Sequence, residues 1–188
     1  MNIIVKPHGS DLCYCRPDTT WERENKDFYV PEGIGQIHWA PVLFVRISKA
    51  GKCIGKKFAS RYYDSFSYGA LLYCVADGDM NVAFSSCADH SSYLPMPLYE
   101  TAVLNTEENT FELYRADEKI YEAACGENLK AALEEAICKA STLTSLRIGD
   151  YVAIELTASQ PLCTKEAGNT KIKASFCEKE TISVNIIF

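Results

Sequence analysis

The sequence lacks an excess of basic residues, a long apolar run and a secretion signal, and each absence excludes a class of protein. Its formal net charge is −6, so the field of the molecule repels phosphate backbones and anionic membrane headgroups. No apolar run approaches the roughly 20 residues that span a bilayer, and the first residues contain no hydrophobic stretch of signal-peptide length. We therefore expect a cytoplasmic protein that binds neither nucleic acid nor membranes.

The sequence also lacks the cysteine spacing of a disulfide framework or a zinc site. Its nine cysteines are odd in number and scattered along the chain. Cys13 and Cys15 form a pair, but no second pair follows at the spacing that zinc ligation requires. We therefore expect reduced thiols in the core and on the surface.

The composition is typical of one compact domain. Hydrophobic residues make up 47% of the chain and charged residues 23%, as in soluble globular proteins. With 188 residues and no repeat or linker, the chain is expected to form a single domain over 1–188. Residues 36–47 predict the strongest strand, buried on both faces, and an apolar stripe over 129–140, capped by Asn128, predicts the main helix.

The other predicted elements are short. Strands are expected over 2–5, 28–30, 65–75 and 151–156, a hairpin over 110–115 and 119–123, and a closing antiparallel pair over 171–176 and 181–187. A short helix is expected over 56–63, and polar loops over 8–27 and 77–97. Strands outnumber helices in an order that fits an α+β fold.

Residues 28–69 resemble the core of the fumarylacetoacetate hydrolase family, in the segment FYVPEGIGQIHWAPVLFVRISKAGKCIGKKFASRYYDSFSYG. The opening IVKPHGS, the hairpin LYRADEKIYEA and the phrase SLRIGDYV are similar to further parts of that family, in the same order. The resemblance implies a β-rich mixed roll of packed sheets with a few short helices, commonly a homodimer. It also implies that the family's N-terminal catalytic segment, which would lie upstream of Met1, is absent.

In that family the strand that matches 36–47 carries His-Tyr-Glu-x-Glu, and a later strand supplies an aspartate. These carboxylates hold Mg²⁺, Mn²⁺ or Ca²⁺, and the two glutamates reach one ion because residues two apart on a strand share a face. Here His38 matches the histidine, but the glutamate positions are Ala40 and Val42, and the aspartate position is Leu71. The position of a lysine that binds or activates substrate falls at Val82.

Divalent ions need oxygen donors, and these replaced positions offer only hydrocarbon. Pro41, between the two glutamate positions, removes a backbone N–H and favours an edge or a bulge. Replacing a whole buried charge cluster by apolar groups is often neutral for stability, whereas losing one member costs about 3–5 kcal/mol. We therefore interpret the old site as a hydrophobic plug with no metal and no catalytic residue. His38 is interpreted as a hydrogen-bonded core residue, with a remnant of the old pocket as the alternative.

These features predict a non-catalytic protein that acts through binding or dimerisation, as a homodimer or with an unidentified protein partner. The alternative is a hydrolase, decarboxylase or isomerase of acylpyruvate-type oxo acids, as the resemblance implies, with a relocated or weak Mg²⁺, Mn²⁺ or Ca²⁺ site. A third reading, a fragment completed by a partner chain, does not restore the carboxylates.

The segment after the predicted strand 65–75 holds the acidic and imidazole groups nearest the old site in sequence, namely Asp77, Asp79, Asp89 and His90. We expect all four to be solvated loop residues. A cysteine nucleophile, Cys74 or Cys87 with His90, is a further candidate that no sequence spacing supports.

Overall fold

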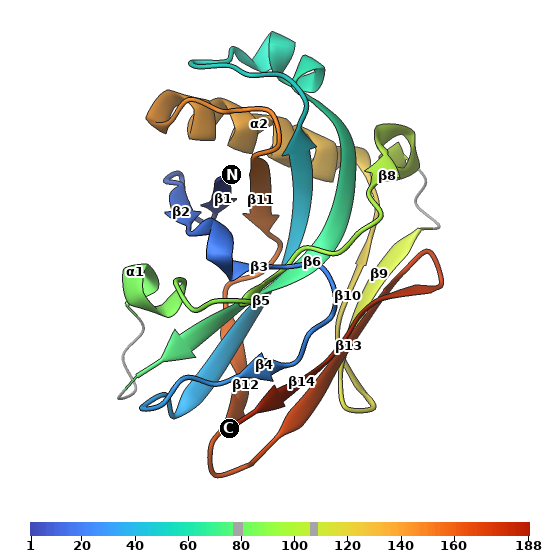
Figure 1. Ribbon diagram of the computed structural model, residues 1–188. Helices are drawn as coiled ribbons and strands as arrows, with labels where there is room; N and C mark the ends of the chain where they lie inside the picture. The colour runs from blue at the N-terminus through green and yellow to red at the C-terminus, as the bar shows by residue number, and fades with distance from the viewer. Residues whose placement is uncertain (77–80, 106–108) are drawn as a thin grey trace.

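The computed structural model describes residues 1–76, 81–105 and 109–188, which form two β-sheets and one long helix (Figure 1). The larger sheet contains β1 (Ile3–Lys6), β2 (Tyr14–Arg16), β3 (Trp21–Glu22), β5 (Gln36–Ile47), β6 (Tyr63–Val75), β7 (Ser92–Tyr93), β8 (Tyr99–Glu100), β11 (Tyr151–Glu155) and β12 (Gln160–Thr164). The smaller sheet contains β4 (Phe28–Tyr29), β9 (Thr110–Arg115), β10 (Glu118–Ala124), β13 (Thr170–Phe176) and β14 (Lys179–Ile187). The helices are α1 (Val82–Ser85), α2 (Glu127–Leu143) and the 3₁₀ turns Asp18–Thr20, Lys56–Arg61 and Thr101–Asn105.

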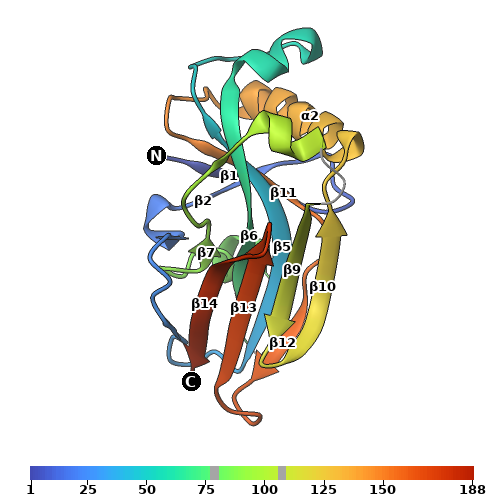
Figure 2. The ribbon, with the colours of Figure 1, turned by 90° about the vertical axis from the view of Figure 1, so that its right-hand side faces the viewer.

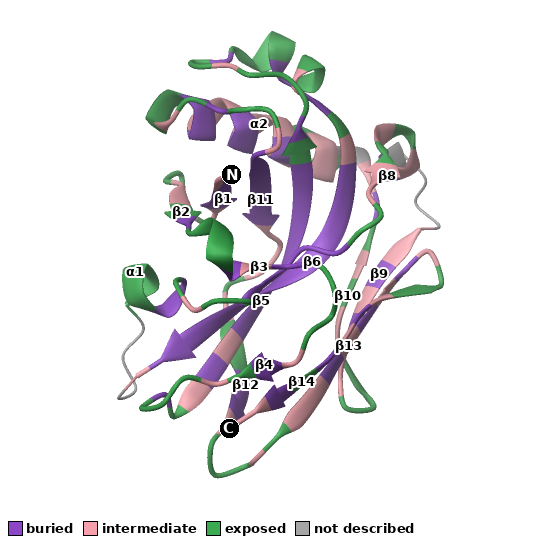
Figure 3. Cartoon of the chain, viewed as in Figure 1, coloured by how far each residue is buried: buried purple, intermediate pink, exposed green. Residues whose placement is uncertain are grey.

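The long strands β5 and β6 form the centre of the larger sheet, which runs in the order β2-β1-β11-β5-β6-β7-β3. β5 pairs antiparallel with β6 along its whole length. On its other edge, residues 36–39 pair with β12 and residues 42–46 pair with β11. The buried stretches of the chain concentrate on β5, β6 and β11 (Figure 3). These three strands therefore position whatever lies on either face of the sheet.

The two faces of the larger sheet have different cores. Figure 2 shows the smaller sheet in front of β5, with α2 above it. Ile37, Trp39 and Val45 of β5 face this layer and join the larger apolar cluster, which α2 enters through Leu133 and Ile137. Ala40, Val42 and Phe44 of β5 belong to a second, smaller cluster on the opposite face, which we call the inner face. The period of two that makes both faces apolar explains why β5 is buried on both sides.

Most predicted strands are confirmed, and the fold is the expected α+β arrangement of mixed sheets with few short helices. The predicted cap at Asn128 is wrong, because α2 begins at Glu127 and its N-cap residue is Gly126. Segment 56–63 forms a 3₁₀ turn over Lys56–Arg61 rather than a regular helix. None of the described helices is long and apolar enough to cross a membrane.

The two segments expected to be loops contain short elements that the sequence did not reveal. Segment 8–27 holds β2 and β3, and segment 77–97 holds α1 and β7 within its described part. β2 pairs with β1, and β3 pairs with β7, which in turn pairs with β6. Strands of two or three residues are too short to show periodicity, so pairing to the sheet decides their structure.

Pro41 occupies the middle of a central strand, so the expected edge or bulge at this position is wrong. It pairs with Ala70 without a register shift, and its carbonyl accepts a hydrogen bond from the Leu156 N–H at 2.9 Å. The N–H and C=O of a strand residue point to the same side. The missing N–H of Pro41 therefore points to Leu156, between the stretches of β5 that pair with β11 and with β12.

A crossing segment covers the second cluster. At Gly69 a Cβ atom would lie 2.3 Å from the Tyr93 carbonyl oxygen and 3.3 Å from the Leu94 side chain. Glycine is therefore required here, because any side chain would displace the chain that runs over the sheet. The Trp21 indole N–H donates to the Leu94 carbonyl at 3.1 Å and holds β3 onto the same cover.

Candidate functional site

The inner face of β5 is the one that carries the second cluster, away from the smaller sheet. From one end of the strand to the other, every second residue lies on this face: His38, Ala40, Val42, Phe44 and Arg46. Neighbouring strands extend this face in register, since Tyr73 lies opposite His38 on β6, and Glu155 and Tyr151 lie opposite Val42 and Arg46 on β11. The face is apolar in the middle and polar at both ends. The candidate site lies at the end formed by Tyr73 and Glu155.

The three residues that the resemblance aligned with metal ligands lie together in one apolar cluster. Ala40 lies opposite Leu71, and Val42 follows on the same face of β5. All three side chains are fully buried. The cluster that contains them consists of Ile3, Val5, Ala40, Val42, Phe44, Leu71, Tyr73, Leu94, Tyr151 and Ala153, and we call it the plug.

The plug does not fit a divalent cation. The alkyl side chains of Ala40, Val42 and Leu71 supply no oxygen donor, so an ion at these positions would have to give up its water shell without replacement. Among residues 1–76, 81–105 and 109–188, no group of three or more His, Cys, Asp or Glu side chains is placed to hold a metal.

The former lysine position, Val82, lies away from the plug. It is the first residue of α1, 44% exposed, behind an N-cap at Asn81 whose side chain accepts the Ala83 N–H at 3.1 Å. Its side chain lines a cavity of about 180 Å³ at the end of the plug. The other lining residues are Pro7, His8, Tyr14, Tyr73, Glu155, Ala158 and Ser159.

A chain of hydrogen bonds joins the polar groups of this cavity. The hydroxyls of Tyr14 and Tyr73 lie 2.7 Å apart, and the Tyr73 hydroxyl donates to Oε1 of Glu155. The other carboxylate oxygen, Oε2, accepts the backbone N–H of His8 at 3.0 Å. We call Tyr14, Tyr73 and Glu155 the phenol–carboxylate triad. Its three members come from β2, β6 and β11.

Burial keeps the two phenols of the triad protonated. It raises the pKa of Tyr73, and the nearby Tyr14 and Glu155 add to the effect. It also raises the pKa of Tyr14, against the opposing charge of Arg16. Both phenols are therefore neutral hydrogen-bond donors near neutral pH, next to a carboxylate that accepts.

A buried cation lies behind the triad. Arg16 is 1% exposed, and its guanidinium carbon lies 5.0 Å from the centroid of the Tyr73 ring. Nη2 donates to the Leu72 carbonyl at 2.7 Å and to the Ser91 hydroxyl at 2.8 Å. Nε and Nη1 have no hydrogen-bond partner, and Arg16 forms no salt bridge with a described residue. Its charge is thus only partly compensated.

His38 differs from its predicted role as a hydrogen-bonded core residue. It is half-buried, its Nδ1 is buried without a partner among the described residues, and burial lowers its pKa. The prediction failed because the ring lies on the inner face opposite Tyr73. The next residue on the same face of β5, Ala40, offers no hydrogen-bonding group. The alternative, a remnant on the old face, agrees better with this environment.

The loop candidates that the structure describes, Asp89 and His90, form no site with the cysteines. Asp77 and Asp79 lie outside the described residues. His90 Nδ1 pairs with the buried Glu22 carboxylate at 2.8 Å, and this partner was not foreseen. Burial raises the pKa of Cys74 to about 11, so its thiol is protonated. Cys87 is exposed, and no hydrogen bond links either cysteine to His90.

Sequence reasoning missed Tyr14, Arg16, Tyr73 and Glu155. Tyr73 could have been found, because it lies two residues after Leu71 and so shares its face. Glu155 is the last residue but one of the predicted strand 151–156, and no motif marked it. No local signal marked Tyr14 and Arg16, which lie in a segment taken for a loop.

Comparison with solved structures places this architecture among known proteins, although no family model and no curated protein sequence matches the chain. A protein of Yersinia pestis CO92 assigned to the fumarylacetoacetate hydrolase family is similar, with a TM-score of 0.77 and 14% identity over 99% of this chain and 92% of that chain. Fumarylpyruvate hydrolase from Pseudomonas aeruginosa, in complex with Mn²⁺ and pyruvate, has a TM-score of 0.72 and 14% identity over 100% and 96%. Maleylpyruvate hydrolase from Sphingobium sp. SYK-6, in complex with manganese(II) and pyruvate, has a TM-score of 0.70 and 18% identity over 97% and 69%.

Proposed function

From the premise that this chain has the fold of the fumarylacetoacetate hydrolase family, we propose that it is an enzyme of proton transfer. Its substrate would be a small oxo acid of the acylpyruvate type, bound at the phenol–carboxylate triad. The observation that carries the proposal is the hydrogen-bonded chain of Tyr14, Tyr73 and Glu155 on the wall of a cavity beside the plug. This reading favours the enzymatic alternative over the non-catalytic protein predicted first.

The position of the cavity supports the proposal. It opens at the end of the inner face of β5, and Val82, at the former lysine position, lines it together with Tyr73. Its volume of about 180 Å³ is below the ~300–1,000 Å³ usual for drug-sized ligands. A molecule with few heavy atoms, such as a pyruvyl group, matches this volume. Two solved structures of the same fold contain pyruvate with manganese.

The chemistry of the triad suits keto–enol tautomerisation. The Glu155 carboxylate would accept a proton from the carbon next to the carbonyl group. The Tyr14 hydroxyl, whose one O–H donates to Tyr73 in this structure, would turn to donate a hydrogen bond to the enolate oxygen. Return of the proton to oxygen or carbon completes the exchange and regenerates the carboxylate. The positive charge of Arg16 behind the Tyr73 ring favours the anionic intermediate, because charges interact strongly in a buried site.

The donor set at Ala40, Val42 and Leu71 does not fit a metal ion, so no step is assigned to one at that point. Proton transfer by a carboxylate and neutral phenols needs only groups that this chain supplies. The manganese in the two hydrolase structures belongs to those proteins.

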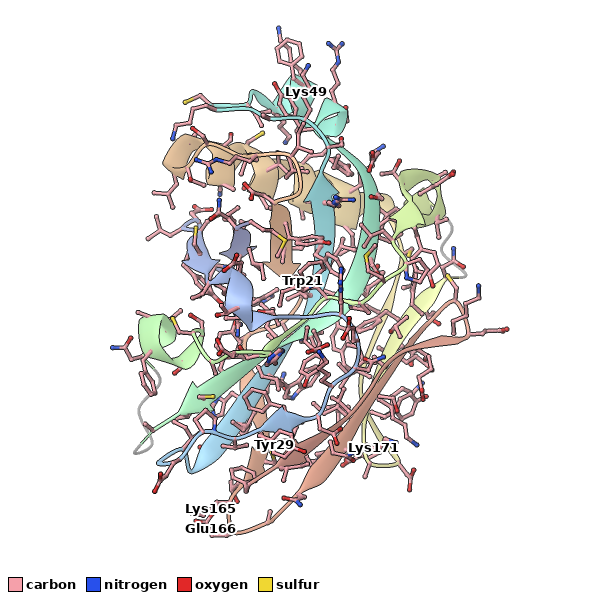
Figure 4. All side chains as sticks on the ribbon, viewed as in Figure 1. Trp21, Tyr29, Lys49, Lys165, Glu166 and Lys171 are labelled. Atoms are coloured by element: carbon pink, nitrogen blue, oxygen red, sulfur yellow. The ribbon has the colours of Figure 1, made fainter. Side chains whose placement is uncertain are left out.

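The test is hydrogen–deuterium exchange at C3 of pyruvate and acetylpyruvate, followed by NMR in D₂O with EDTA. The wild-type protein should accelerate exchange, and Glu155→Gln should reduce the acceleration by at least about 100-fold, as expected for loss of a general base. Glu166→Gln is the matched control, since this glutamate is exposed and does not line the cavity (Figure 4). Wild-type exchange no faster than with Glu155→Gln would refute the proposal.

One observation favours a second candidate function, a binding protein without catalysis. The complete burial of Ala40, Val42 and Leu71 closes the point at which an ion would polarise a substrate. Under this reading pyruvate or acetylpyruvate raises the melting temperature of the protein, yet C3 exchange stays at the rate without protein. The two measurements together separate the two functions.

A further inference from the structure

We propose that the opposite end of the inner face holds a second binding site, for phosphate esters of small planar groups. It is a pocket of about 440 Å³, lined by Met1, Trp21, Arg23, Arg46, Met96, Arg147, Ile148, Gly149, Asp150 and Tyr151. We call it the arginine pocket, after Arg23, Arg46 and Arg147. It does not depend on the proposed reaction at the triad.

The fold brings the three arginines together from separate segments. Arg46 lies near the end of β5, opposite Tyr151 of β11, and Arg147 lies in the turn that leads into β11. Arg23 follows β3, with its guanidinium carbon 5.2 Å from the centroid of the Trp21 ring. Only the pairing of β3 with β7 carries Arg23 to this end of the face.

The pocket has an excess of positive charge in a chain whose net charge is −6. Its one carboxylate, Asp150, accepts hydrogen bonds from the backbone N–H groups of Asn2 at 2.7 Å and Arg147 at 2.8 Å. Arg46 and Arg147 form no salt bridge with a described residue, and Arg23 lies 3.8 Å from the exposed Glu24. Three guanidinium groups against one carboxylate leave about two uncompensated charges.

The walls of the pocket specify the rest of the ligand. Trp21 and Tyr151 form an aromatic wall, with ring centroids 5.3 Å apart and planes tilted by 52°. The side chains of Met96 and Ile148 are exposed at the rim. Guanidinium groups bind phosphate oxygens through paired N–H donors, and an aromatic wall binds a planar ring. Together they suit a phosphate group attached to a planar ring.

The arginine pocket and the triad cavity are separate sites. Between His38 and Arg46, the inner face of β5 carries only the hydrocarbon side chains of Ala40, Val42 and Phe44. The two cavities share no lining residue. Variants of the arginine pocket should therefore leave C3 exchange unchanged, so failure of one proposal does not decide the other.

Tryptophan fluorescence gives a direct test. The chain has two tryptophans, and Trp39 is 3% exposed in the core on the other face, so a ligand in the pocket changes mainly the Trp21 emission. Phenyl phosphate should bind at least about tenfold more tightly than inorganic phosphate or phenol, because it engages both halves of the pocket. Arg46→Gln/Arg147→Gln should weaken its binding at least about tenfold.

The matched control is Lys165→Gln/Lys171→Gln, which removes the same charge at the far end of the molecule (Figure 4). It should retain phenyl phosphate affinity within about twofold. Thermal melting of each variant verifies the fold. Equal affinity of phenyl phosphate and inorganic phosphate, or equal losses in the two double variants, would overturn the proposal and indicate non-specific attraction of anions.

Discussion

The two ends of the inner face of β5 are built from the same strands but have opposite character. At one end Tyr73 and Glu155 form a buried chain with Tyr14. At the other end Arg46 and Tyr151 open into a wide pocket with two further arginines. The contrast shows that the alternating direction of side chains along a strand decides which of them share a face. The neighbouring loops decide the charge at each end of that face and how open each end is to a ligand.

The plug makes this contrast possible. Its hydrocarbon side chains fill the middle of the face, at the positions that the resemblance aligned with metal ligands. The plug carries no buried charge, so it needs no counterion from either end of the face. The charge at one end can therefore differ from the charge at the other. Variants that break the plug, its cover or either end test how far the comparison holds.

The largest expected effect follows from placing a charge in the plug. Val42→Glu should lower the free energy of unfolding by about 3–5 kcal/mol, because an isolated carboxylate would be buried among alkyl groups. Urea denaturation measures the loss. Val42→Gln has the same shape without the charge and should lose less.

Mn²⁺ should not restore the stability of Val42→Glu, since the new carboxylate and Glu155 opposite it do not complete a coordination shell. If the variant instead gains stability with Mn²⁺, the plug still has the geometry of a metal site. The triad end and the arginine-pocket end of the inner face would then belong to one altered metal site.

The cover of the plug is tested at Gly69. Gly69→Ala places a Cβ atom 2.3 Å from the Tyr93 carbonyl oxygen and should cost about 1–3 kcal/mol through the forced shift of the crossing segment. Gly35→Ala is the control, because a Cβ there meets nothing within 4 Å. Equal melting temperatures for the two variants would show that the segment does not press on the sheet.

At the buried end, Tyr73→Phe removes the hydroxyl that joins Tyr14 to Glu155. The expected loss of unfolding free energy is about 1–3 kcal/mol, because Glu155 and Tyr14 both lose a partner in a largely buried place. Tyr14→Phe leaves the bond between Tyr73 and Glu155 and should cost less. Arg46→Gln, at the exposed end, should change stability by less than about 0.5 kcal/mol. A larger effect of Arg46→Gln would erase the contrast.

The smallest expected effect is the pH dependence contributed by His38. Burial lowers its pKa in the folded state from the ordinary 6.5, so the unfolded chain binds the proton more readily. Its contribution to stability is fully present above about pH 6.5 and decreases as the pH falls below that value. Urea midpoints of the wild type and His38→Gln should therefore diverge between about pH 7 and pH 5, with the wild type losing more.

A large part of the fold was predictable from local patterns. The range 36–47 coincides with β5, and the closing strands β13 and β14 pair as expected. The convergence of Ala40, Val42 and Leu71 was predictable too, because a period of two fixes a shared face. The homodimer implied by the resemblance stays a prediction.

The sequence by itself determined the long strands, which side chains share a face along each of them, and the hydrocarbon at Ala40, Val42 and Leu71, because side-chain direction along a strand depends only on local geometry. Only the tertiary structure decided that Tyr14 and Arg16 meet Tyr73, and that Arg23 joins Arg46 and Arg147. These residues come from short strands that exist through pairing with distant partners. Their pairing is a long-range contact, and no local pattern in the chain specifies it.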